Sequence, residues 1–348
     1  MNTRSKQILS LAFVATGLAT LLAATLPEVF SATFSEDGDA VQRRFEFSYR
    51  VRISKIPRGA EKIEVSIPVP RSDDQQTVID QSVTSNLEYT RVTDPEYGNH
   101  ILIFTGLRGA DNKTALPDSV DIQMDVTVTR REAGAPLSHI AAEADHPGAL
   151  MRFLEPDRLA PIDGPIAEEA RGVIGEDMET LAKARALYDH LFTTMSYDKS
   201  GEGWGRGDAI YACDVRSGNC TDIHSLFIAM ARSSGIPARF VMGFPLPPGD
   251  SAGEIPGYHC WAEFYVDDLG WIPVDISEAI KHPEKKDYFF GRLDPNRVAF
   301  TIGRDIKVKT SAGNEELNYF IYPHTLVDGR PFDGATHNFA FTEVSQQP

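Results

Sequence analysis

The sequence predicts an α+β fold in which an antiparallel β-sandwich is followed by a helix packed on an antiparallel sheet. Residues 41–132 contain short segments that alternate apolar and polar side chains, with turn residues between them, which is the pattern of a sandwich. Residues 166–348 open with apolar side chains at helical spacing and continue with aromatic and β-branched runs, which indicate helices and then strands. The prolines of residues 133–165 mark a connector between the two parts.

The predicted sandwich carries little chemistry. Its alternating segments lie at residues 45–53, 62–67, 100–104 and 120–129. It contains no cysteine and a single histidine, His100, so we find no catalytic cluster in it. We therefore expect this domain to have a structural or binding role.

Length and charge limit the classes of function. A chain of 348 residues with 42% apolar residues can build two domains with hydrophobic cores. Its formal net charge of −16 disfavours nucleic acid and anionic membrane surfaces as partners, because phosphate binding requires a basic surface. We expect no nucleic-acid partner, and the sequence makes no prediction of the oligomeric state.

The first 32 residues have the pattern of an export signal. Arg4 and Lys6 precede an uncharged, largely apolar run from residue 8 to residue 26, and small residues follow it. The run is longer than most cleaved signals, so residues 1–32 are either a signal peptide that is removed or an anchor that stays in the inner membrane. We expect the rest of the protein to be exported, periplasmic or extracellular, with membrane contact only through this segment.

The most informative stretch begins at Cys220. Turn residues at 218–219 precede it, apolar side chains follow at positions 223, 226, 227 and 230, and Gly235 ends the pattern. This i, i+3, i+4, i+7 spacing predicts a helix with one buried face, so Cys220 lies in its first turn. Unpaired N–H groups and the positive end of the helix dipole favour a thiolate there, which makes Cys220 a candidate nucleophile.

Two downstream segments supply the partners that a thiol nucleophile needs. Residues 258–266 and 271–275 are predicted as two strands joined by a turn, with His259 on the first strand and Asp275 on the second. A nucleophile, a base and a group that orients the base form a catalytic triad. We therefore predict Cys220, His259 and Asp275 as the catalytic residues, although the pattern does not determine the strand register that aims Asp275.

Other side chains near Cys220 have less certain roles. Asp222 suits the positive end of the helix dipole, and His224, one helical turn after Cys220, is either a core histidine or a catalytic accessory. The backbone N–H of Cys220 is the best candidate donor to an oxyanion. Trp204 and Tyr211 are candidates for a second donor.

The segments around this site are predicted from spacing and composition. Helical spacing over residues 166–192, interrupted near Gly172 and Gly175, indicates two helices. Residues 201–207 are rich in glycine and residues 245–257 are rich in proline and glycine. We expect both stretches to be irregular loops that form the rims of a cleft.

Four sequence blocks resemble the signature of the transglutaminase-like superfamily. The signature is a cysteine that opens a helix, a Gly-Ile-Pro-Ala-Arg, a His-x-Trp-x-Glu strand, and a Gly-Trp-x-Pro-x-Asp strand. Here the blocks stand at Cys220, 235–239, 259–263 and 270–275. The resemblance implies a papain-like core with a Cys-His-Asp triad, and thus a catalytic domain at 166–348. Cys260 departs from the pattern, because it takes a place often held by a small residue.

The three cysteines leave alternatives open. If Cys220 stays free as the nucleophile, Cys213 and Cys260 either form a disulfide in an oxidising compartment or remain thiols. Strand alternation places Cys260 on the face opposite His259, so such a bridge would leave the catalytic face intact. A zinc site built from these cysteines with His224 and His259 is disfavoured, because no Cys-x2–4-Cys pair is present. We predict no metal, calcium included, and no organic cofactor.

The predicted activity is attack of the Cys220 thiolate on an amide or peptide bond to give an acyl-enzyme. Hydrolysis of a peptide or protein substrate in the cell envelope, as a peptidase or amidase, is favoured. Transfer of the acyl group to a lysine amine would instead make the protein a cross-linking transglutaminase. A third alternative is a non-catalytic envelope protein that binds a partner through a cleft with a vestigial triad.

Overall fold

The structure is a computed structural model that describes residues 41–109, 116–134, 150–267 and 269–344. The predicted signal or anchor at residues 1–32 lies outside the described residues. None of the helices in the described ranges is long and apolar enough to cross a membrane.

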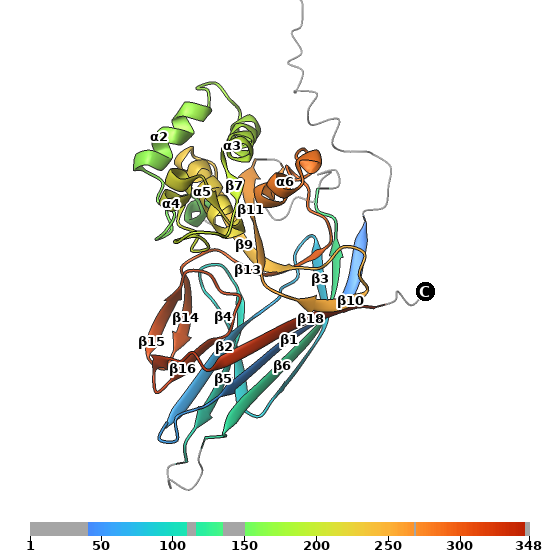
Figure 1. Ribbon diagram of the computed structural model, residues 1–348, viewed down its shortest axis with the longest axis vertical. Coiled ribbons are helices and arrows are strands. Elements are labelled where there is room, and N and C mark those ends of the chain that lie inside the picture. Colours follow the sequence, from blue (N-terminus) through green and yellow to red (C-terminus); the bar gives the residue numbers. More distant parts are fainter. Residues whose placement is uncertain (1–40, 110–115, 135–149, 268, 345–348) are drawn as a thin grey trace, which may run out of the picture. The chain divides into compact units, whose positions relative to one another are not determined.

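Two five-stranded antiparallel sheets form the sandwich (Figure 1). The first sheet has the order β10-β18-β1-β6-β3, with bounds Ala252–Ile255, Ala335–Glu343, Gln42–Ser54, Ser119–Arg131 and Gln76–Ser85. The second has the order β17-β16-β2-β5-β4, with bounds Arg330–Pro331, His324–Val327, Lys62–Val69, His100–Leu107 and Glu88–Thr93. The four alternating segments predicted from the sequence fall in β1, β2, β5 and β6.

The last strands of the chain belong to this sandwich. β18 pairs with β1 from Phe45 opposite Glu343 to Ile53 opposite Ala335, and β16 pairs with β2. The sequence prediction placed all of residues 166–348 in the catalytic domain, so the sheet pairing differs from it at the C-terminal end. The reason is that alternation identifies a strand but not its partner, and the partners of these strands lie near the other end of the chain.

The predicted irregular rim at residues 245–257 also contains a strand. β10 pairs with β18, with Ile255 opposite Phe339. The partner strand again lies far away in the sequence, so the local proline and glycine content indicated a loop.

Strand β1 shows how the alternating pattern builds the core. Phe47 is buried, and its ring lies 5.1 Å from that of Phe244 and 5.4 Å from that of Phe300. The neighbouring Tyr49 is also buried and donates its hydroxyl hydrogen to the carbonyl oxygen of Ile321 at 2.8 Å. Phe244 lies on β9 (Ala238–Pro245) and Phe300 on β13 (Arg297–Ile302), both in the sheet next to Cys220, so the sandwich and that sheet share apolar contacts.

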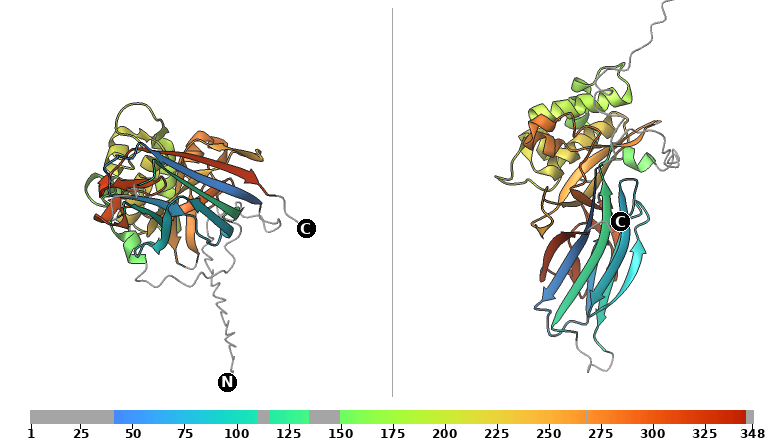
Figure 2. Two further views of the ribbon diagram at one scale, coloured as in Figure 1. Left: turned by 90° about the horizontal axis from the view of Figure 1, so that it is seen from below. Right: turned by 90° about the vertical axis from the view of Figure 1, so that its right-hand side faces the viewer.

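The part of the chain that carries Cys220, His259 and Asp275, called the Cys220 region below, contains a four-stranded antiparallel sheet and five α-helices among the described residues. The sheet order is β12-β11-β9-β13, with bounds Gly270–Val274, His259–Val266, Ala238–Pro245 and Arg297–Ile302. The helices are α2 to α6, with bounds Gly164–Val173, Thr180–Thr194, Ala209–Val215, Cys220–Ser233 and Ile276–Lys281. Figure 2 shows these helices gathered beside the sheet.

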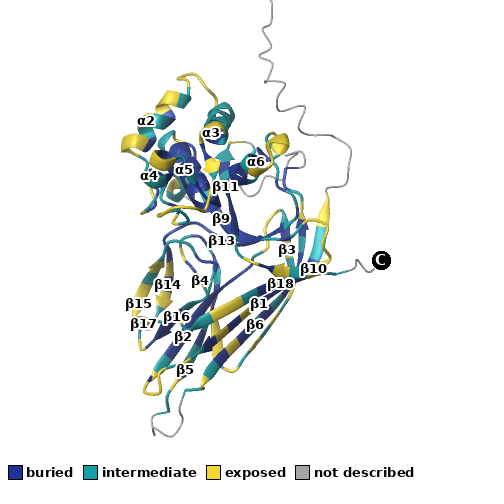
Figure 3. Cartoon of the chain, viewed as in Figure 1, coloured by how far each residue is buried: buried dark blue, intermediate teal, exposed yellow. Residues whose placement is uncertain are grey.

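Helix α5 lies at the centre of the Cys220 region. It packs on β11 and β9 and also contacts α2, α3 and α4. Every residue from Cys220 to Arg232 is buried, as the dark blue of α5 shows (Figure 3). The sequence predicted one buried face, but neighbours on all sides bury the polar face as well.

Short elements complete the described chain: η1 Met151–Leu154, η2 Pro283–Lys285, β7 Ser196–Tyr197, β8 Ser217–Gly218, β14 Ile306–Thr310 and β15 Gly313–Leu317. The α+β fold class, with a sandwich built on the N-terminal strands and a helix packed on an antiparallel sheet, is confirmed.

Candidate active site

Cys220 is the first residue of α5, directly after the N-cap residue Asn219. The Asn219 side-chain oxygen accepts the backbone N–H groups of Thr221 at 2.9 Å and of Asp222 at 3.4 Å, and Asp222 Oδ2 accepts the backbone N–H of Asn219 at 3.0 Å. This reciprocal arrangement is a capping box, which determines where the helix begins. The Cys220 side chain is therefore held at the positive end of the helix dipole.

Asp222 also attaches the glycine-rich rim to this helix. Its Oδ2 accepts the backbone N–H of Gly205 at 2.6 Å, and its Oδ1 accepts that of Gly207 at 2.9 Å. Both glycines have positive φ, of 82° and 64°, which other residues adopt only with strain. The rim is thus positioned next to Cys220 by one buried carboxylate that serves three N–H donors.

We expect Asp222→Asn to destabilise the protein by about 1–3 kcal/mol, because the amide NH2 would face an N–H donor and leave it unpaired. Urea unfolding monitored by circular dichroism measures this cost. The matched control is Asp208→Asn at the N-cap of α4, where one oxygen accepts the N–H groups of Ile210 and Tyr211 and the other is free to become the NH2. Equal costs for the two variants would contradict the special role of Asp222.

His259 and Asp275 come together where two paired strands meet a helix. Ala262 of β11 lies opposite Val274, the last residue of β12, and Asp275 follows as the N-cap of α6. His259 Nε2 lies 2.7 Å from Asp275 Oδ2. Asp275 Oδ1 meanwhile accepts the backbone N–H of Glu278 at 3.0 Å. The same carboxylate therefore caps α6 and contacts the histidine.

A buried arginine that the sequence analysis missed completes this group. Arg297 Nη1 donates to Asp275 Oδ2 at 2.9 Å, and its Nη2 donates to Asp294 Oδ2 at 3.2 Å. Burial opposes ionisation of Asp275, but the charges of His259 and Arg297 outweigh it and hold the pKa of Asp275 well below its usual range. Arg297 lies beyond the four sequence blocks, and no local pattern marks it.

The contacts of Cys220 and His259 favour an ion pair. A hydrogen bond from Cys260 lowers the pKa of Cys220. Burial raises this pKa and His259 lowers it further, so that it lies well below its ordinary value. Burial opposes protonation of His259, but Asp275 and the contact with Cys220 raise the pKa of His259 to about 10. Since Nε2 faces Asp275, Nδ1 is the nitrogen left for Cys220. These two pKa shifts favour a thiolate on Cys220 and an imidazolium on His259 at neutral pH, and the thiolate is the reactive form of a cysteine.

This ion pair predicts a particular pH dependence. We expect iodoacetamide to alkylate Cys220 at its full rate near about pH 7 and to slow only in acid, where the thiolate gains a proton. An unperturbed thiol would lose reactivity below about pH 8.5. Mass spectrometry of the peptide that contains Cys220, sampled over time from about pH 4 to 10, gives the midpoint. A midpoint at or above the unperturbed value would contradict the ion pair.

Cys260 does not point away from the catalytic residues, in contrast to the prediction from strand alternation. Its thiol contacts Cys220 and lies 3.7 Å from Nδ1 of His224 on α5. β11 begins at His259, so His259 reaches Cys220 from the end of the strand while Cys260 faces the helix. All three cysteines are free, and Cys213 Sγ donates to Glu169 Oε2 at 2.9 Å, so Cys213 and Cys260 are not joined.

Two tyrosine hydroxyls belong to the surroundings of Cys220 and were not assigned a chemical role from the sequence. Tyr258 Oη accepts the side-chain N–H of Asn219 at 3.1 Å. Tyr197 lies on β7, which pairs with β8 directly before Asn219. Burial first, and then the charge of Cys220, raises the pKa of both tyrosines. Both hydroxyls therefore keep their protons and can donate hydrogen bonds at the site.

The remaining candidate donors are less directly placed. Tyr211 lies on α4, and its ring would be 3.0 Å from a Cβ atom added at Gly203 of the rim. Trp204 is half-buried in the same rim. A role for Trp204 or Tyr211 as the second oxyanion donor stays a prediction. Within the described ranges, no three or more His, Cys, Asp or Glu side chains are arranged to hold a metal ion.

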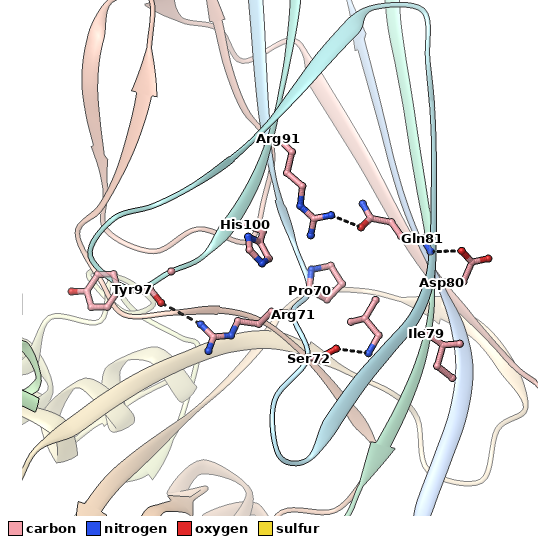
Figure 4. Close-up of a pocket in the computed structure, with 11 residues that line it drawn as sticks. Pro70, Arg71, Ser72, Ile79, Asp80, Gln81, Arg91, Tyr97 and His100 are labelled. Atoms are coloured by element: carbon pink, nitrogen blue, oxygen red, sulfur yellow. Dashed lines mark hydrogen bonds between the residues drawn. The ribbon is translucent and has the colours of Figure 1, made fainter. Parts of the chain in front are cut away.

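A separate cavity of about 810 Å³ opens in the sandwich, between β3 on one side and β4 and β5 on the other (Figure 4). Arg71, Arg91 and His100 line it, together with Asp80 and the exposed side chain of Ile79. None of the three triad residues contributes to this cavity.

Comparison with known proteins places the site in a family context. Residues 168–276, which include Cys220, His259 and Asp275, match the model of the transglutaminase-like superfamily. An uncharacterized protein of Haemophilus influenzae is 28% identical over 320 residues, which cover 80% of this chain and 84% of that protein. The uncharacterized protein YebA of Bacillus subtilis is 25% identical over 115 residues, which are 29% of this chain and 16% of that protein.

A solved structure shares the fold. A proposed cysteine protease from Cytophaga hutchinsonii superposes with a TM-score of 0.52 at 18% sequence identity, and the match covers 87% of this chain and all of that one. At this identity the likeness concerns the fold alone. The resemblance to the transglutaminase-like superfamily that the four sequence blocks predicted is confirmed by the match over residues 168–276.

Proposed function

We propose that this protein is an exported thiol enzyme that cleaves amide or peptide bonds through an acyl-enzyme on Cys220. The observation that carries the proposal is the continuous set of contacts from Cys220 to His259 and from His259 to Asp275. The match to the transglutaminase-like superfamily and the fold shared with a proposed cysteine protease support it. The apolar run of residues 8–26 supports export.

In the first half of the reaction, the Cys220 thiolate attacks the carbonyl carbon of the scissile bond and its electron pair moves to the oxygen. The backbone N–H of Cys220, at the start of α5, donates to this oxyanion. His259 Nδ1 then gives its proton to the departing amine as the carbon–nitrogen bond breaks. A thioester on Cys220 remains.

In the second half, neutral His259 accepts a proton from water, and the resulting hydroxide attacks the thioester carbonyl. The carbon–sulfur bond breaks, the acid leaves, and the thiolate and imidazolium form again. Asp275 keeps the Nε2–H of His259 in place throughout and stays ionised. Arg297 keeps the carboxylate of Asp275 oriented toward the His259 ring, because Arg297 and His259 donate to the same oxygen of Asp275.

The acceptor in the second half is water or an amine. A transferase must exclude water from its thioester, which requires a dry acceptor channel. One wall near the site is aromatic, with the ring of Tyr258 5.8 Å from those of Tyr319 and Tyr322. The glycine-rich rim, which accepts the Tyr319 hydroxyl at the carbonyl oxygen of Gly205, is open to solvent, because residues 201–203 and Arg206 are exposed. We therefore favour hydrolysis over transfer.

We expect acyl groups to partition mainly to water. The purified protein would be incubated with glutamine-containing peptides and with cell-wall peptides, each with and without a labelled primary amine, and the products would be identified by mass spectrometry. Cys220→Ala is the control for background reaction. Dominant incorporation of the amine would show that the protein is a cross-linking transglutaminase.

A further inference from the structure

The surroundings of Cys260 determine the direction of a chain of hydrogen bonds. His224 is buried, and its Nε2 accepts the backbone N–H of Ile276 at 3.1 Å. A ring nitrogen that accepts from a backbone N–H carries no proton. Burial lowers the pKa of His224 to about 4, so the ring is neutral at pH 7 and its one proton is on Nδ1.

The Nδ1–H of His224 faces the sulfur of Cys260 at 3.7 Å, so this sulfur accepts a hydrogen bond. Burial, and then its contact with Cys220, raises the pKa of Cys260 well above the ordinary value, so Cys260 keeps its proton. Among the described residues, its other hydrogen-bond partner is Cys220, whose pKa is the lowered one of the two thiols. The S–H of Cys260 therefore points to the Cys220 thiolate.

We propose that Cys260 is a second thiol of the active site, which donates a hydrogen bond to the Cys220 thiolate and is itself oriented by His224. The chain runs from the Ile276 N–H to His224, from His224 to Cys260, and from Cys260 to Cys220. This inference rests on the proposed function, because it takes Cys220 as the nucleophile. It gives a role to a residue that departs from the family pattern.

Other titratable groups also interact with Cys220. They come from α5, from the segment that leads into β11 and from β11 itself, from β7 and from the segment before β16: Asp222, His224, Tyr258, His259, Tyr197 and Tyr322. Of these, His259 carries the positive charge next to the thiolate. The test must therefore separate the hydrogen bond of Cys260 from the charge of His259.

The experiment measures the rate of Cys220 alkylation against pH in the exported chain, with the modified peptide identified by mass spectrometry. We expect Cys260→Ala to raise the midpoint by about one pH unit or more, because a hydrogen bond to a charged group is lost. Cys260→Ser keeps a donor of similar size and should restore a midpoint near that of the wild type. Cys213→Ala, a buried thiol bonded to Glu169, should leave the profile unchanged.

The outcomes distinguish the two proposals. If wild-type Cys220 is unreactive at every pH, the proposed function fails. If wild-type Cys220 is reactive and Cys260→Ala has the same midpoint, the role of Cys260 is overturned. If Cys260→Ser shifts the midpoint as far as Cys260→Ala, packing and not hydrogen bonding accounts for the effect, which also overturns the proposal.

The sandwich cavity carries a second, independent inference. The protein is strongly acidic, yet two arginines and a histidine converge there (Figure 4). Arg91 donates to the side-chain oxygen of Gln81 at 3.3 Å, and Arg71 donates to the carbonyl oxygen of Tyr97 at 3.2 Å. These partners are neutral, and no ion pair with a carboxylate forms for either arginine among the described residues. Burial and then the charges of both arginines lower the pKa of His100.

Two guanidinium groups that have neutral partners at an open cavity favour an anionic ligand, because a carboxylate accepts charge-assisted hydrogen bonds from guanidinium groups. Asp80 is the one acidic residue that lines the cavity, so the lining keeps a net positive charge. The exposed Ile79 beside it offers an apolar contact to a neighbouring side chain. We infer that this cavity binds the carboxylate of an acidic peptide.

The test is a titration of the exported chain with a fluorescent peptide rich in glutamate, followed by anisotropy and by NMR of the His100 ring. We expect binding to raise the pKa of His100 by roughly half a pH unit or more. The double variant Arg71→Gln/Arg91→Gln should abolish binding, whereas Arg50→Gln/Arg52→Gln, which lines another groove of the sandwich, should not. Binding that survives the first variant, or equal displacement by inorganic phosphate, would overturn the assignment.

Discussion

We expect Cys220→Ala to abolish both turnover and covalent labelling by a thiol-directed electrophile at neutral pH. The loss of turnover should be at least about 10⁴-fold, because the neighbouring thiol of Cys260 keeps its proton and cannot replace Cys220 as the attacking thiolate. The fold should change little, since the side chain lies at the first residue of α5 and the helix is capped by Asn219 and Asp222. Mass spectrometry of the labelled protein and thermal unfolding measure the two effects.

The control for this prediction is Cys213→Ala, because Cys213 is also buried but bonds to Glu169. Burial and the Glu169 contact raise the pKa of Cys213 to about 12, so this thiol should not react at neutral pH. Preferential labelling of Cys213 or Cys260 in the wild-type protein, with Cys220 unmodified, would contradict the assignment of the nucleophile.

We expect Asp275→Asn to have the second largest effect, with a loss of roughly 10⁴-fold in turnover. An amide in place of the carboxylate presents either an NH2 or a neutral oxygen to His259 and Arg297, so the imidazolium loses its partner and its orientation. The change also leaves the charge of Arg297 in the interior with Asp294 as its remaining carboxylate partner among the described residues. It should therefore cost about 3–5 kcal/mol of stability.

The cost of Asp275→Asn should depend on pH. The raised pKa of His259 contributes stability that is fully present below its unfolded pKa of about 6.5 and is lost as the pH rises through about 10. The lowered pKa of Asp275 contributes stability that is present above about pH 4 and is lost in stronger acid. The difference in unfolding free energy between wild type and variant should thus be greatest between about pH 4 and 6.5.

Glu278→Gln is the matched control for Asp275→Asn. It neutralises a carboxylate on the first turn of α6 that lies 3.9 Å from His259 Nε2. Glu278 also pairs with Lys281 and is partly exposed, so its loss should be small. A smaller effect for Asp275→Asn than for Glu278→Gln would contradict the central position of Asp275 in the site.

The sequence was sufficient to find the residues that local patterns mark. Cys220 follows turn residues and opens a helical stripe, and His259 and Asp275 lie in strand-like blocks with short gaps, so their proximity could be predicted. Arg297 could not be found, because its partner Asp275 lies on a different element and neither residue changes the local pattern. The predicted position of Cys260 was wrong. Alternation describes side chains within a strand, and Cys260 lies one residue from the end of β11, where His259 contacts Cys220.

The fold class was predictable for a similar reason. Alternation in β1, β2, β5 and β6 is strong enough to identify strands, and helical spacing identified α2, α3 and α5. The membership of each sheet was not predictable. The pairing of β10 and β18 depends on partners far away in the sequence, and no local signal specifies such a partner.

The position of β18 has a consequence for how the protein is made. A chain emerges from the ribosome and from an export channel with its N-terminus first, so β1 appears long before the residues that pair with it. β18 lies between β1 and β10 in the sheet, and both strands keep an unpaired edge until residues 335–343 arrive. Unpaired edges invite aggregation, and pairing across such a separation is slow. A nascent chain interrupted before these residues would carry all three triad residues but two open strand edges, and we expect it to be cleared by proteases before it can act.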